Sequence, residues 1–87
     1  MITRHVVANQ LTRYLHGEIS LTQLVHWGEE AMKEGEFAEA DFDVIREVVA
    51  KIGLADVAAF GLTWEDCTSM LARLGYRATV VVQSGAT

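Results

Sequence analysis

Hydrophobic residues recur at helical spacing along most of this chain. In the first such stretch, from about Arg4 to His16, apolar side chains lie three and four positions apart and therefore share one face of a helix. The same spacing returns in three later stretches, which begin at Ser20, at about Asp41 and at Thr63. Each pattern predicts an amphipathic helix with one buried face.

Capping residues and glycines mark the predicted helix ends. Thr3 is placed to cap the first helix, and Ser20 followed by Gln23 is the capping-box pattern, in which each side chain satisfies a free backbone N–H of the other. Thr63 and Asp66 form a weaker version of this pattern before the last helix. The four predicted helices are followed by Gly17, Gly35, Gly53 and Gly75. A glycine at this position is typical of a helix end.

The aromatic side chains are assigned by their phase with the apolar faces. Trp64 is in phase with Cys67 on the last helix, so we expect it in the core, and Phe42 begins the apolar stripe of the third helix. Phe37 is expected to anchor a polar connection to the core. Trp27 lies beside the main stripe of its helix, so it either closes the edge of the core, which we favour, or anchors an interface.

The segment Tyr76–Gln83 has the composition of a β-strand and follows the last helix. Val80 and Val82 would lie on one face and Val81 on the other, so the strand is apolar on both faces. It pairs with the N-terminal residues Ile2–Val7, with a second chain, or with nothing. Self-pairing across a two-fold axis is the simplest alternative to an internal mate. The predicted dimer-interface residues are Tyr76, Thr79, Val80, Val81 and Val82.

These patterns predict a mainly α fold: a compact bundle of four to five short helices with one C-terminal β-strand. The fifth helical piece would be a short connector at residues 54–60. Residues 1–83 are expected to form a single domain with its terminal strand, and residues 84–87 a loose tail.

Composition narrows the classes of function. The 87 residues carry 12 acidic and 7 basic side chains, a net charge of −5, which argues against binding nucleic acid through its phosphates. No apolar run approaches the length of a membrane helix, and the first residues lack the features of a signal peptide. Cys67 is the sole cysteine. We therefore expect a reduced, cytoplasmic protein that does not bind membranes.

The acidic residues are unevenly distributed. Seven of the twelve lie between Glu29 and Asp43, against Lys33 as the one base in this stretch. They form either a solvated face or a docking surface for a basic partner, whose association the negative field would steer. The predicted partner-binding residues are Glu34, Glu36, Glu39, Asp41, Asp43 and Trp27.

Catalytic and metal chemistry have little support in the pattern. His26 and Glu30 lie one helical turn apart and make half of a metal site, which would need a further ligand from His16 or Glu18. Cys67 lies on an apolar helix face, where a thiol acts as a small hydrophobic group. No phosphate-binding glycine motif is present. We expect no catalytic residue and no cofactor.

The segment Leu11–Trp27 resembles a recurring opening of small bacterial immunity proteins of the colicin and contact-dependent-inhibition kinds. The shared features are an aromatic-containing helix, a break that reads Gly17-Glu18-Ile19-Ser20, and a second helix that reaches Trp27. The resemblance covers about 17 of the 87 positions. It implies a small, acidic, helical protein that neutralises a basic toxin domain by binding it, and it assigns no role to any single residue.

The function predicted from the sequence is therefore that of a non-enzymatic protein-binding module, an immunity-like inhibitor of a basic partner. One alternative is a structural or assembly protein that forms a homodimer through its C-terminal strand. A second alternative is a metal-binding protein that uses His26 and Glu30.

Overall fold

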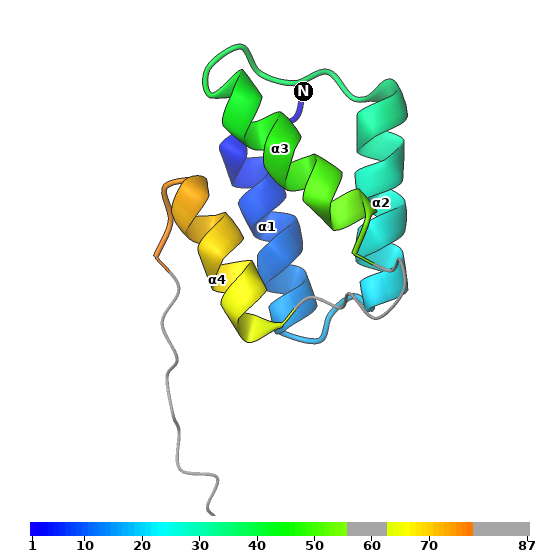
Figure 1. The fold of residues 1–87 in the computed structure, drawn as a ribbon. Helices are drawn as coiled ribbons and strands as arrows, with labels where there is room; N and C mark the ends of the chain where they lie inside the picture. Colours follow the sequence, from blue (N-terminus) through cyan, green and yellow to red (C-terminus); the bar gives the residue numbers. More distant parts are fainter. Residues whose placement is uncertain (56–62, 78–87) are drawn as a thin grey trace, which may run out of the picture.

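Four helices account for most of the residues that the structure describes, 1–55 and 63–77 in a computed structural model (Figure 1). They are α1 (Arg4–Leu15), α2 (Leu21–Glu34), α3 (Phe42–Gly53) and α4 (Trp64–Arg73). Their bounds match the predicted helices to within a few residues, and the mainly α fold is confirmed. No β-strand occurs within the described residues. The predicted strand from Ala78 onward, the tail and most of the predicted connector lie outside them.

The predicted capping boxes are present and define where two helices begin. The Ser20 hydroxyl accepts a hydrogen bond from the Gln23 N–H at 3.1 Å, and the Gln23 side-chain oxygen accepts one from the Ser20 N–H at 2.8 Å. Thr63 and Asp66 make the same reciprocal pair, with both bonds at 3.0 Å. These bonds satisfy N–H groups that have no partner within the helix.

Helices α2 and α3 make the most extensive helix–helix contact, and two glycines lie at their crossing. A Cβ on Gly28 would lie 2.9 Å from both the Gly53 nitrogen and the Ile52 Cγ2. The absence of a side chain at Gly28 therefore lets the two backbones approach closely. Helix α1 contacts all three other helices, and α4 packs against it (Figure 1).

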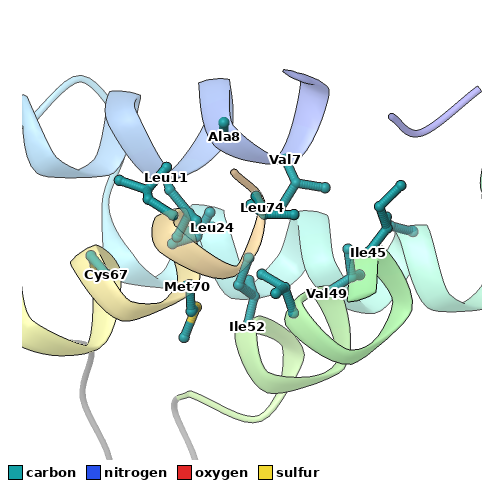
Figure 2. Close-up of a cluster of buried hydrophobic side chains, with 13 residues drawn as sticks. Val7, Ala8, Leu11, Leu24, Ile45, Val49, Ile52, Cys67, Met70 and Leu74 are labelled. Atoms are coloured by element: carbon teal, nitrogen blue, oxygen red, sulfur yellow. The ribbon is translucent and has the colours of Figure 1, made fainter. Parts of the chain in front are cut away.

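One hydrophobic core joins the four helices (Figure 2). Its largest fully buried side chains are Leu11, Leu24, Ile45, Ile52, Leu74, Val7, Val48, Val49 and Cys67. Among the described residues no polar or charged side chain is buried. Burial of apolar surface is therefore what holds the helices together.

The N-terminus is tied to the α2–α3 connection by a single parallel bridge between Ile2 and Phe37. The Ile2 N–H donates to the Glu36 carbonyl at 2.6 Å, and the Ala38 N–H donates to the Ile2 carbonyl at 2.9 Å. Helix α1 begins at Arg4. The N-terminal segment was the predicted internal partner of the C-terminal strand. It instead bonds to the α2–α3 connection through Ile2 and begins α1 at Arg4.

Two aromatic residues that were expected on buried faces are exposed instead. Trp64 and Phe42 are each 43% exposed, so the prediction that Trp64 lies in the core is wrong. Both are the first residues of their helices. Side chains on a helix tilt toward its N-terminus, so a first-turn residue in phase with the buried face can project past the end of the core.

Candidate functional site

The predicted partner-binding carboxylates lie together at one end of the molecule. We call this set, Glu34, Glu36, Glu39, Asp41 and Asp43, the acidic end. It spans the last residue of α2, the connection to α3 and the first turn of α3, and all five residues are exposed. In Figure 1 this connection passes over the end of the bundle where the N-terminus lies.

Asp41 differs from the rest of the acidic end because it has a structural partner. Its carboxylate lies 3.2 Å from the Arg4 Nε, and its backbone adopts a left-handed conformation with φ 61° and ψ 25°. Although it precedes α3, its side chain makes no capping hydrogen bond. The Arg4 Nη1 also donates to the Leu74 carbonyl at 3.1 Å. Asp41 therefore links the start of α3 to Arg4 on α1, and Arg4 in turn reaches the end of α4.

The other four carboxylates of the acidic end have no ion pair or side-chain hydrogen bond within the described residues. Several bases elsewhere on the molecule are already paired, as Arg13 is with Glu18, and as Lys51 and Arg73 are with Glu47. The carboxylates of the acidic end are close together along the chain and open to solvent, so their negative potentials add. This arrangement can attract a cationic group, and its effect will weaken as salt rises.

An aromatic pair lies within the acidic end. The rings of Phe37 and Phe42 meet edge to face, with centroids 5.9 Å apart. Phe37 is half-buried and packs against the core, as predicted, whereas Phe42 remains exposed between Asp41 and Asp43. The sequence pattern placed Phe42 on the apolar face of its helix and did not predict its exposure. Its position directly after a predicted helix start was the signal that could have revealed it.

Trp27 does not join the acidic end. It is half-buried and packs against the core cluster, which agrees with the prediction that it closes the edge of the core. It lies near the middle of α2, whereas the acidic end begins at the last residue of that helix, Glu34. The structure therefore places Trp27 apart from the other predicted partner-binding residues.

Of the predicted dimer-interface residues, Tyr76 alone lies within the described part of the chain. It is exposed and follows α4, and its N–H donates to the Leu71 carbonyl at 2.8 Å. It therefore closes the end of α4 rather than beginning a strand. Thr79, Val80, Val81 and Val82 lie outside the described residues.

His26 and Glu30 are the candidate metal ligands, and Cys67 is the candidate thiol. His26 and Glu30 are exposed on α2, and within residues 1–55 and 63–77 no three His, Cys, Asp or Glu side chains gather closely enough to hold a metal ion. Cys67 lies in the core, as predicted. Burial and, to a smaller extent, the nearby Asp66 carboxylate raise the pKa of its thiol from 9.0 to about 11. The thiol therefore stays protonated and weakly nucleophilic at neutral pH.

Comparisons of the chain with protein families, with curated proteins and with solved structures found no match. No described helix has both the length and the apolar character needed to cross a membrane. Within residues 1–55 and 63–77, the fold and the surface define a small all-α unit of four helices with an exposed acidic end.

Proposed function

We propose that this protein is a non-enzymatic binding module whose acidic end docks a basic protein partner. The observation that carries the proposal is a set of four carboxylates, Glu34, Glu36, Glu39 and Asp43, that are exposed and unpaired among the described residues. The exposed Phe42, directly before Asp43, belongs to the same stretch of chain. Interfaces commonly combine an aromatic anchor that becomes buried with polar groups around it. The carboxylates would speed association with a cationic surface, and Phe42 would contribute apolar contact area and a face for an arginine side chain.

The resemblance of Leu11–Trp27 to small immunity proteins supports a more specific form of the proposal. In that form the basic partner is a toxin domain, and the protein inactivates it by covering its functional surface. The acidic character and the helical fold agree with this role. The test is coexpression: the product of a neighbouring gene should arrest growth when made alone, and this protein should relieve the arrest.

The docking surface is tested by capture of partners from the source cell. The protein is immobilised, retained proteins are eluted with rising salt, and they are identified by mass spectrometry. The double variant Glu36→Lys with Glu39→Lys should lose the salt-eluted partner, because two unpaired carboxylates are reversed. The matched control, Glu30→Lys with Glu65→Lys, changes the net charge equally at two exposed sites outside the acidic end and should retain it. Equal retention by both double variants would refute the proposal.

Phe42→Ala gives a second test of the same surface. We expect its partner to dissociate more than tenfold faster, because the interface loses an aromatic anchor. The ring is 43% exposed and contacts Phe37, so circular dichroism of the variant must show that the helices are retained. Asp41 is less suitable for such a test. Its substitution would also break the ion pair with Arg4 and would disturb the fold.

A second candidate is an assembly protein that dimerises through the segment from Tyr76 to Gln83. One observation favours it: Ile2 already bridges to Phe37 and Arg4 begins α1, so the segment's internal mate is occupied. Val81→Lys in the full chain should then yield a monomer, as measured by sedimentation. A dimer of unchanged affinity would count against this candidate.

A further inference from the structure

An apolar groove of about 370 Å³ lies between α2 and α3. Its lining residues are Glu29, Met32, Lys33, Ala50, Gly53 and Leu54. Leu54 is 64% exposed, which makes it the most exposed large hydrophobic residue of the described chain after Met1. An exposed leucine therefore lines the groove together with the small residues Ala50 and Gly53.

The wall of the groove formed by α2 carries one charge of each sign. Glu29 and Lys33 are one helical turn apart, in the order that favours an ion pair along a helix. Neither makes an ion pair or a side-chain hydrogen bond within the described residues. A carboxylate and an ammonium group therefore flank the groove, and both are free to pair with groups outside this chain.

We propose that a second copy of this chain covers the groove across a two-fold axis. If α2 of one copy runs antiparallel to α2 of the other, Glu29 of each copy faces Lys33 of the other, and two ion pairs form. Leu54 of each copy then enters the hollow of the other. A two-fold interface must be self-complementary in this way, because the same surface supplies both sides.

The groove differs from the acidic end because it is lined by charges of both signs, Glu29 and Lys33. A strongly basic partner would meet Lys33 unfavourably, whereas a second copy matches both signs at once. The inference therefore does not depend on the function proposed for the acidic end. It also places the dimer contact on α2 and α3, and not on the C-terminal segment.

We expect a weak dimer, because the contact consists of one small groove and two exposed ion pairs. Its dissociation constant should be on the order of 100 μM. Analytical ultracentrifugation of the full chain over a range of concentrations should show a monomer–dimer equilibrium. A chain that stays monomeric up to about 1 mM, which marks the weakest specific association, would overturn the proposal.

Leu54→Glu is the first variant to measure. It places a charge in the apolar hollow of the other copy, so we expect the dissociation constant to rise by at least about 100-fold. Its exposure in the monomer means that circular dichroism should show an unchanged helix content. A dimer of unchanged affinity in this variant would contradict the proposed contact.

A charge-swap series tests the predicted orientation. Glu29→Lys alone, or Lys33→Glu alone, replaces two attractive pairs with two repulsive ones and should raise the dissociation constant by about tenfold. The double variant with both substitutions restores opposite charges and should recover affinity close to that of the unsubstituted chain. Failure of this rescue would refute the antiparallel arrangement of the two α2 helices.

Two controls separate this contact from other origins of a dimer. Glu65→Lys changes the net charge as Glu29→Lys does, but it lies on α4 and should leave the dimer unchanged. Val81→Lys should also leave it unchanged. If Val81→Lys abolishes the dimer and Leu54→Glu does not, the contact lies on the C-terminal segment and the groove proposal is wrong.

Discussion

At the scale of single residues, the two glycines at the α2–α3 crossing have unequal surroundings. A Cβ at Gly28 would lie 2.9 Å from backbone and core atoms, whereas a Cβ at Gly53 would meet its nearest neighbours at an ordinary 3.6 Å. The same substitution should therefore have opposite effects at the two positions.

Gly28→Ala should lower the free energy of unfolding by about 1–3 kcal/mol, because the helices must move apart to accept the methyl group. Gly53→Ala should leave stability unchanged or raise it by up to about 1 kcal/mol, since alanine is the better helix former. Urea denaturation of both variants measures the difference. Equal losses at the two positions would show that the crossing is not limited by Gly28.

Cys67 should make the stability of the fold depend on pH in the alkaline range. Its thiol pKa is raised from 9.0 to about 11 by burial and by Asp66, so the unfolded chain loses this proton at a lower pH than the folded chain does. The stability that comes from this group is fully present below about pH 9 and is lost as pH rises through about 11.

The unfolding free energy should therefore fall more steeply between these pH values for the native chain than for Cys67→Ala. The alanine variant will be less stable at neutral pH because it leaves a cavity, so the slopes with pH are compared and not the absolute values. Parallel slopes would show that the thiol does not titrate differently on folding.

At the scale of elements, the helix ends were the part of the fold that local sequence predicts best. A capping box needs only residues three positions apart, and both predicted boxes are formed. The aromatic first-turn residues show the limit of this approach. Their phase matches the buried face, but whether Trp64 and Phe42 reach the core depends on where the neighbouring helix ends, which periodicity does not record.

The candidate site was predictable in part for the same reason. The clustering of the acids along the chain is a local property, so their presence together at one end follows from the sequence. The ion pair between Arg4 and Asp41 joins residues far apart in the chain, and the exposure of Phe42 depends on packing. Neither could be derived from spacing alone.

The Ser20 cap of α2 should contribute measurably to the stability of the protein. Ser20→Ala removes the hydroxyl that accepts from the Gln23 N–H and should cost about 1 kcal/mol of stability. Thr22→Ala, in the first turn of the same helix, is the matched control and should be neutral or slightly stabilising because of its higher helix propensity. Thermal unfolding followed by circular dichroism distinguishes the two. Similar losses in both variants would argue against the cap.

At the scale of the whole molecule, Arg4 joins three helices. Its guanidinium pairs with Asp41 before α3 and donates to the Leu74 carbonyl at the end of α4. Arg4→Met keeps the aliphatic stem and should lower stability by about 1–2 kcal/mol through loss of the charged hydrogen bond and the half-exposed ion pair.

Arg46→Met is the control for loss of a positive charge, because Arg46 is exposed and makes no ion pair within the described residues. We expect its unfolding free energy to change by less than about 0.5 kcal/mol. Comparable losses in the two arginine variants would show that the contacts of Arg4 contribute nothing beyond charge.

The contact between Arg4 and Leu74 also bears on the order of folding. It spans 70 positions, so on a ribosome it cannot form until the last helix has emerged, whereas α2 and α3 are neighbours along the chain. The α2–α3 hairpin is therefore expected to form early and the closure by Arg4 late. In stopped-flow kinetics Gly28→Ala should chiefly slow folding, and Arg4→Met should chiefly speed unfolding. Arg4, although it is synthesised before α2, α3 and α4, would then be among the last residues to reach its final partners.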